Sequence, residues 1–471
     1  MDISQLDLSR LQFATTTIFH FLFVPVTIGL AFLVAILQTW WHRSGHEELR
    51  RLTRFFGTLL VINIAIGVVT GIVQEFEFGM NWSQYSRFVG DVFGAPLAME
   101  GLVAFFLEST FLGLWLFGWD VLPKRVHLAC IWALAIGSAL SAAFIMAANS
   151  WMQHPVGIDT DPTTGRPVLT DIGALFTNPV FTWGYAHVLL ASLVTGSVLM
   201  LAVSAWHLRR GSSPEAFVRT AKLSLLVLLP SSLLVLHVGS HLGIVETTYQ
   251  PMKVAAMEAQ WETCSPCSFS VAQTGGWTSS DQDATKIIEV PHLLSILATG
   301  SADGQVTGLD ELQSQYEEKY GPGDYTPNVP VQYWSMRTMA YLATLLPLLA
   351  LWGVWLWWRK KLLTARVFHS VATWSVLTPF VMNTAGWMLT ENGRQPWIVQ
   401  GLLLTKDGNS PSVSTGEVLL TLVVFWVMYL VLGAVWVHLM RRYARRGLDE
   451  TGAGVDDDGD PSDNRPVVLT Y

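Results

Sequence analysis

The sequence has few charged residues and few cysteines. Asp, Glu, Lys and Arg make up 14% of its 471 residues, compared with about a quarter in soluble proteins, while hydrophobic residues make up 51%. This balance excludes an ordinary soluble domain and is typical of a polytopic membrane protein. Three cysteines are too few for a disulfide framework. The formal net charge of -8 comes from acids gathered in one loop and the tail, and it indicates no nucleic-acid partner.

Nine apolar runs are each long enough to cross a membrane as a helix, which takes about 20 residues. Only a helix satisfies its own backbone hydrogen bonds in lipid at this length. We therefore predict an all-α polytopic membrane protein with nine transmembrane helices. The runs lie near residues 12–41, 55–75, 96–118, 126–149, 181–208, 218–240, 332–358, 369–390 and 415–440.

Basic residues are concentrated in the connections at one face of the membrane, which predicts that this face is cytoplasmic. The amino terminus is then outside and the carboxyl terminus inside. We divide the chain into six helices in 1–240, an outward loop in 241–331, three helices in 332–447 and a disordered acidic tail in 448–471. The basic clusters include Arg43, Arg50, Arg51 and Arg54 near the second run and Arg441, Arg442, Arg445 and Arg446 after the last.

A histidine and a methionine reach the same depth on two different helices. His187 and Met339 each lie about 10 Å below the outer end of their runs at an α-helical rise of ~1.5 Å per residue. An imidazole and a thioether can supply both axial bonds of a low-spin haem iron, and Arg337 nearby can pair with a haem propionate. The competing interpretation is that Met339 packs and His187 is hydrogen-bonded.

Three further donors lie in the outer half of the bilayer: His20, Glu100 and Glu391. Ionisable groups in lipid are costly and mark functional sites. A five-coordinate haem needs one protein ligand and an open side, so His20 or a glutamate can each hold one. Glu391 can alternatively be a loop residue paired with Arg394.

Two carboxylates lie along one predicted helix. Glu108 follows Glu100 by eight residues, which is ~12 Å along an α-helix and about 80° around its axis, so both can face the bundle interior. Stacked carboxylates of this kind predict a proton relay, which Ser141 on the next helix can extend through water. The alternative is that Glu108 is a structural hydrogen-bonded carboxyl.

Other histidines and cysteines leave alternatives open. His237 and His241 are spaced i and i+4 at the outer end of the sixth run, which suits a metal or haem. Cys264 and Cys267 in the outward loop are either an oxidised pair that stiffens the loop or plain spacing. The histidines near inner ends are interpreted as solvated; they are His42, His46, His127, His207, His369 and His438.

Five stretches resemble subunit I of cytochrome bd quinol oxidase. The resemblance covers nearly everything except the acidic tail. Its motifs are FGAPLAMEG at 93–101, FFLEST at 105–110, NSWMQHPVG at 149–157, WSMRTM at 334–339 and GWMLTENGRQPW at 386–397.

The resemblance implies a set of cofactors and ligands, in helices packed as four-helix bundles plus an extra helix. His187 and Met339 would hold low-spin haem b, with Arg337 nearby. His20 would hold haem d and Glu391 high-spin haem b, although these two assignments can be exchanged and another haem can replace haem d. Trp387 would pack beside them, with Arg394 in the same motif. Glu100 would border the oxygen site, and Glu108 with Ser141 would line proton uptake.

The resemblance also implies a quinol oxidase of the bacterial cytoplasmic membrane. Lys253 and Glu258, in the stretch KVAAME, would bind the headgroup of menaquinol or ubiquinol at the outer face and accept its protons, in the family's short loop form. O2 would be reduced to water without a proton pump. A homologous subunit II and small single-span subunits would be partners. Two rival interpretations are a haem-binding electron-transfer subunit without oxygen chemistry and an ion transporter or channel.

Overall fold

The computed structural model describes residues 4–448, and almost all of the predicted tail, 448–471, lies outside this range. Long helices dominate, and the prediction of an all-α membrane protein is confirmed. They are α1 (Gln5–Phe21), α2 (Val24–Ser44), α3 (Glu47–Met80), α4 (Ser83–Met99), the π-helical η1 (Glu100–Phe105), α5 (Phe106–Phe117), α6 (Lys124–Gln153), α8 (Pro179–Arg210), α9 (Pro214–Tyr249), α13 (Val329–Trp358), α14 (Arg366–Trp374), α15 (Thr378–Gly393) and α16 (Thr415–Ala444).

Local sequence signals define several helix ends. Asn178 caps α8 by accepting a hydrogen bond from the Val180 N–H at 3.0 Å, and Pro179 occupies the first helical position. Ser414 and Glu417 form a reciprocal capping box at the start of α16. Gly211 ends α8 with a φ of 69°, a left-handed conformation that glycine adopts without a Cβ penalty.

Eight helices within the described residues are long and apolar enough to cross a membrane, with α1 and α2 together forming the first. The predicted run at 369–390 is present but broken, because a 3-10 turn, η2 (Ser375–Leu377), separates α14 from α15. Neither piece alone is long enough to count as a span. The total of nine and the orientation therefore remain predictions.

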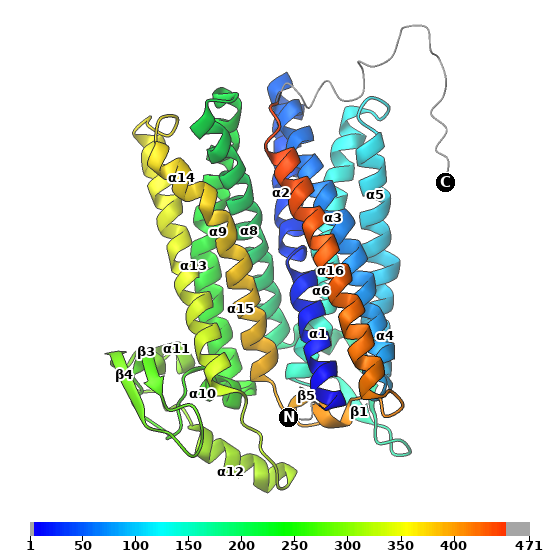
Figure 1. The fold of residues 1–471 in the computed structure, drawn as a ribbon, viewed down its shortest axis with the longest axis vertical. Coiled ribbons are helices and arrows are strands. Elements are labelled where there is room, and N and C mark those ends of the chain that lie inside the picture. Colours follow the sequence, from blue (N-terminus) through cyan, green and yellow to red (C-terminus); the bar gives the residue numbers. More distant parts are fainter. Residues whose placement is uncertain (1–3, 449–471) are drawn as a thin grey trace.

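The helices form two groups of four, with α16 outside them (Figure 1). In one group α2, α3 and α6 pack with the continuous rod of α4, η1 and α5. In the other, α8, α9 and α13 pack with the rod of α14 and α15. The helix α16 packs on α1 and α3.

The two groups meet where α2 crosses α8 with its backbone in direct contact. A Cβ at Gly29 would lie 1.9 Å from the Ser192 carbonyl oxygen, and one at Gly196 would lie 2.4 Å from the Gly29 carbonyl carbon. Small residues allow this close approach, which favours helix association in lipid.

The loop that is predicted to face outward, called the outer loop below, begins later than predicted, because α9 runs to Tyr249 rather than ending near 240. Its elements gather at the end of the molecule where the amino terminus lies (Figure 1). They are α10 (Pro251–Met257), the antiparallel hairpin β3 (Phe269–Gly275) and β4 (Ala284–Val290), α11 (Leu293–Thr299) and α12 (Leu309–Tyr320). Shorter connections contain β1 (Ile158–Thr160), β2 (Pro167–Leu169), α7 (Ile172–Thr177), β5 (Trp397–Val399), β6 (Leu403–Leu404) and η3 (Thr405–Asp407).

The interpretation of all six inner histidines as solvated is wrong for three of them. His127, His207 and His369 are buried, and each imidazole Nε2 bonds a backbone carbonyl. His127 Nδ1 also bonds the side chain of Gln38, at 2.9 Å. The sequence did not show these partners because they come from other helices or turns.

Candidate functional site

His187 and Met339 lie in the helix group of α8, α9, α13 and α15, each facing a glycine of a neighbouring helix. A Cβ at Gly239 on α9 would lie 3.1 Å from His187 Cε1, and one at Gly386 on α15 would lie 3.1 Å from Met339 Sδ. His187 Nδ1 is buried without a hydrogen-bond partner within residues 4–448. An imidazole nitrogen left without a protein partner, a thioether on another helix of the same group and glycine clearances fit the ligand set of a haem.

His20 is held in the tautomer that suits a metal ligand. Its Nδ1 lies 3.0 Å from Thr70 Oγ1, and the Thr70 hydroxyl donates its proton to the Gly67 carbonyl at 2.9 Å. The Thr70 oxygen therefore accepts from Nδ1–H, which leaves the lone pair on Nε2. The ring packs on Gly71, where a Cβ would lie 3.0 Å from Cε1.

Glu391 lies near the end of α15 with both carboxylate oxygens engaged. Asn149 donates to Oε1 at 2.8 Å, and Arg394 pairs with Oε2. Trp387, one turn earlier, makes an edge contact with Phe21 at 4.9 Å between ring centroids. Phe21 follows His20, so the structure brings the His20 and Glu391 helices into contact.

Glu100 and Glu108 both lie against α6. Ser141 donates a hydrogen bond to Glu100 Oε1 at 2.8 Å, a direct contact where the sequence suggested a water. Glu108 packs beside Gly137, one turn from Ser141. The π turn η1 lies between the two carboxylates, so the angle expected for a regular α-helix does not apply. π-helical turns are rare in proteins, and those that occur are frequently at functional sites.

Lys253 and Glu258 in the outer loop are both buried, and each pairs with a different residue. Lys253 Nζ lies 2.8 Å from Glu246 Oε2, and Glu258 Oε2 lies 2.7 Å from Arg337 Nη2. Burial lowers the pKa of the Lys253 ammonium, an effect that Glu246 opposes. Burial raises the pKa of the Glu258 carboxyl, an effect that Arg337 opposes. The burial of both side chains excludes the simpler explanation of Lys253 and Glu258 as solvated loop charges.

Arg337 of α13 bonds several residues of the outer loop. Besides Glu258, its guanidinium donates to the carbonyls of Met257 at 2.5 Å and Ser270 at 2.6 Å and lies 3.6 Å over the Tyr333 ring. Its Nε is buried without a partner among the described residues. The role of Arg337 toward a haem propionate remains a prediction.

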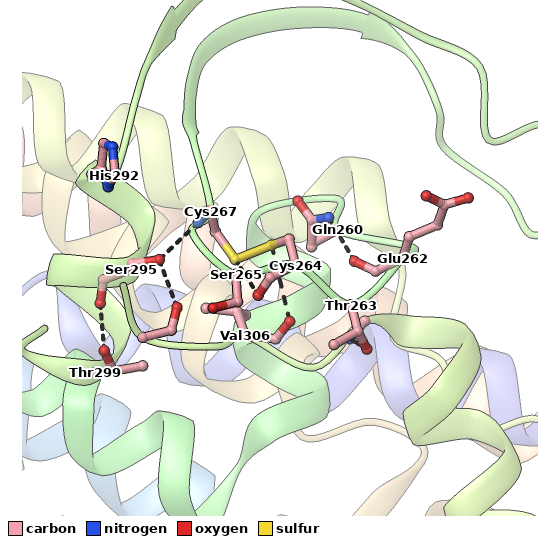
Figure 2. Close-up of a disulfide and its surroundings, with 12 residues drawn as sticks. Gln260, Glu262, Thr263, Cys264, Ser265, Cys267, His292, Ser295, Thr299 and Val306 are labelled. Atoms are coloured by element: carbon pink, nitrogen blue, oxygen red, sulfur yellow. Dashed lines mark hydrogen bonds between the residues drawn. A yellow bond between two sulfur atoms is a disulfide. The ribbon is translucent and has the colours of Figure 1, made fainter. Parts of the chain in front are cut away.

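Cys264 and Cys267 form a disulfide, so the first of the two interpretations is confirmed (Figure 2). The backbone of Cys264 pairs with Val306, and the Cys267 N–H donates to Ser295 Oγ at 2.8 Å. The disulfide thus stiffens the segment that leads from Glu258 into β3.

His237 and His241 lie within α9, since this helix continues beyond them. The His241 ring stacks on Trp183 of α8 at 4.7 Å, and the His237 ring lies 4.7 Å from it. The part of the chain that the structure describes contains no group of three or more His, Cys, Asp or Glu side chains placed to hold a metal ion. The contact with Trp183 gives His241 a packing role.

The sequence did not identify several partners of these residues. Asn149 and Gln153 belong to the motif NSWMQHPVG, but the sequence assigned no role to either residue. It assigned none to Thr70 or Glu246 either. A signal for the last was available, because Glu246 is a carboxylate at the outer end of a membrane helix, seven residues before Lys253.

The fold and these donors define a class of protein. A polytopic helical bundle with imidazole, thioether and carboxylate donors on its membrane helices has the ligand set of a membrane haem protein. Comparison with known proteins then identifies the family: residues 8–448 match "Cytochrome bd terminal oxidase subunit I", and the chain belongs to that family. Cytochromes carry haem, so membership implies haem cofactors.

Relatives with known names cover nearly the whole chain. The chain is 44% identical over 448 residues to "Cytochrome bd ubiquinol oxidase subunit 1" of Bacillus subtilis (strain 168), covering 95% of both. It is 37% identical over 500 residues to "Cytochrome bd-II ubiquinol oxidase subunit 1" of Escherichia coli (strain K12), covering 94% of this chain and 96% of that protein.

A solved structure has the same fold. The bd oxidase from Geobacillus thermodenitrificans matches with a TM-score of 0.84 and 29% identity, covering 94% of this chain and 99% of that one. The apolar helices and the bacterial relatives identify a multi-pass protein of the bacterial plasma membrane.

Proposed function

We propose that this chain is the haem-carrying subunit of a terminal quinol oxidase, which oxidises membrane quinol at the outer face and reduces O2 to water. The observation that carries the proposal is the state of the donors: His20 keeps its Nε2 lone pair, and buried His187 Nδ1 has no partner within residues 4–448. Both rings face glycines, Gly71 and Gly239.

Three haems follow from this assignment. His187 and Met339 hold low-spin haem b, His20 holds haem d, and Glu391 holds high-spin haem b, with the last two open to exchange. When bound, the haems supply one-electron transfer and an iron with an open position for O2. The chain contributes ligand orientation: Thr70 fixes the His20 tautomer, and Asn149 and Arg394 orient the Glu391 carboxylate.

The outer loop binds the quinol. Lys253 and Glu258 are a buried cation and a buried carboxyl near the outer end of the bundle, and such groups can bind a quinol headgroup and accept its protons. Each quinol gives up two electrons and two protons, and these protons leave at the outer face. The quinol is menaquinol or ubiquinol.

Protons for water formation come from the inner face. The Glu108 carboxyl and the Glu100–Ser141 pair lie on successive turns against α6, which supports a relay toward the oxygen site. Releasing protons outside and taking them up inside builds a gradient without pumping. The names of the relatives as subunit 1 support a second membrane subunit as partner, and small single-span subunits are a further expectation.

Two measurements on the purified complex test this function. We expect oxygen consumption driven by a soluble quinol, together with b-type and chlorin bands in the reduced-minus-oxidised spectrum. Full haem loading without a chlorin band and without oxygen consumption would favour the electron-transfer rival. Active protein without any pigment would favour the transporter.

A further inference from the structure

The ammonium of Lys253 is held by two residues from different helices. Its Nζ lies 2.5 Å from Gln153 Oε1 and 2.8 Å from Glu246 Oε2. Gln153 is the last residue of α6, and Glu246 lies in the last turns of α9. Lys253 is 3% exposed and Gln153 4% exposed, so this contact is not a surface ion pair that solvent can replace.

The backbone of Gln153 is fixed as well. The side chain of Gln250, directly before α10, donates to the Gln153 carbonyl at 2.5 Å. The end of α6 is therefore attached to the start of α10, the helix that carries Lys253. Two independent contacts thus set the position of Lys253 relative to α6.

The same glutamine continues the hydrogen-bond chain toward Glu391. Gln153 Nε2 donates to Asn149 Oδ1 at 3.0 Å, and Asn149 Nδ2 donates to Glu391 Oε1 at 2.8 Å. Asn149 precedes Gln153 by four residues, so both side chains lie on one face of α6. An unbroken run of side-chain hydrogen bonds therefore joins Lys253 to Glu391.

A glutamine at this position serves both neighbours, whereas a carboxylate serves only the Lys253 ammonium. The Gln153 side chain accepts from an ammonium with its oxygen and donates to an amide oxygen with its nitrogen, which neither a carboxylate nor an alkyl chain does. Gly393 leaves room for the Lys253 side chain, because a Cβ at Gly393 would lie 2.3 Å from Lys253 Cγ.

We propose that Gln153 is a positioning residue of the quinol site, which fixes the Lys253 ammonium and connects it through Asn149 to the Glu391 carboxylate. This inference rests on the proposed function, in which Lys253 binds the quinol headgroup. Without the Gln153 oxygen, the ammonium is drawn to Glu246 alone and leaves the position that the headgroup needs.

The experiment uses the purified complex with ubiquinol-1 as substrate and measures KM, kcat and the optical spectrum. Gln153→Met removes the acceptor, and we expect KM to rise at least tenfold with kcat changed less than threefold and all haem bands present. Gln153→Glu keeps an acceptor oxygen and should return KM to within threefold of the wild-type value. The control is Gln273→Leu, since Gln273 is also buried in the outer loop but bonds the Gly275 carbonyl; its KM should not change.

The connection to Glu391 has its own readout. Asn149→Leu removes the donor to Glu391, and we expect a shift of the high-spin haem absorbance band. An unchanged band would overturn this half of the proposal.

The outcomes separate the two hypotheses. An unchanged KM in Gln153→Met, with a tenfold rise in Lys253→Leu, would overturn the role of Gln153 and retain the quinol site. An unchanged KM in Lys253→Leu would overturn the quinol site itself. If Gln153→Met does not retain its haems, the KM of Gln153→Glu tests the proposal instead. A value within threefold of wild type supports the role of Gln153, and a tenfold rise overturns it.

Discussion

Gly393, the last residue of α15, packs against Lys253. The substitution Gly393→Ala therefore tests whether the outer loop binds quinol at Lys253. A Cβ there would lie 2.3 Å from Lys253 Cγ and 2.3 Å from Gln332 Nε2. Ordinary contacts between such atoms are about 3.5–4.0 Å. Gln332 is fully buried, so neither neighbour can move without disturbing others.

The size of the effect follows from the overlap. Overpacking by one methyl group typically costs about 1–3 kcal/mol. If this cost falls on the Lys253 position that binds quinol, the affinity falls roughly five- to 150-fold. We therefore expect Gly393→Ala to raise the KM for ubiquinol-1 within that range while the haem bands persist.

The matched control is Gly416→Ala at the start of α16, where no described heavy atom lies within 4 Å of the added Cβ. Its KM should equal that of the wild type. The assay is oxygen consumption against ubiquinol-1 concentration. An unchanged KM in Gly393→Ala, with correct haem content, would refute the placement of quinol binding at Lys253.

Other substitutions test the remaining assignments. Met339→Leu should abolish the low-spin haem signal, because leucine has no sulfur ligand, while carbon monoxide still binds the high-spin iron; loss of every haem would indicate misfolding instead. Glu108→Gln should slow proton uptake and turnover by about tenfold or more with all haems retained, and normal oxygen consumption would rule out the relay. Burial lowers the pKa of Lys253, so its ammonium deprotonates below the usual value of 10.5 and KM should rise with pH in that range. The arginine in Lys253→Arg keeps its charge to about pH 12 or above, so KM should begin to rise only at higher pH. The same pH dependence of KM in both proteins would contradict the role of the ammonium.

The sequence predicted the helical spans well because hydropathy is a local property. The equal depth of His187 and Met339, which follows from the fixed rise of a helix, stays a prediction. The break of the run 369–390 at Ser375 was missed, since a short 3-10 turn leaves the apolar composition unchanged.

Partners from distant segments were not predictable in this way. Glu258 pairs with Arg337, which lies 79 residues away, and Asn149 bonds Glu391 across 242 residues. The sequence assigned Arg337 to a haem propionate and Glu258 to the quinol, and nothing in the spacing indicated that the two side chains meet. Such contacts depend on how helices pack, which hydropathy and periodicity do not specify.

In the proposed function, side chains on the membrane helices of this chain bind haem iron, and a cryo-EM density map of the purified complex would show whether they do. We expect a macrocycle bound between His187 and Met339, and two others bound at His20 and Glu391. A map in which these four side chains contact only protein or lipid would contradict it.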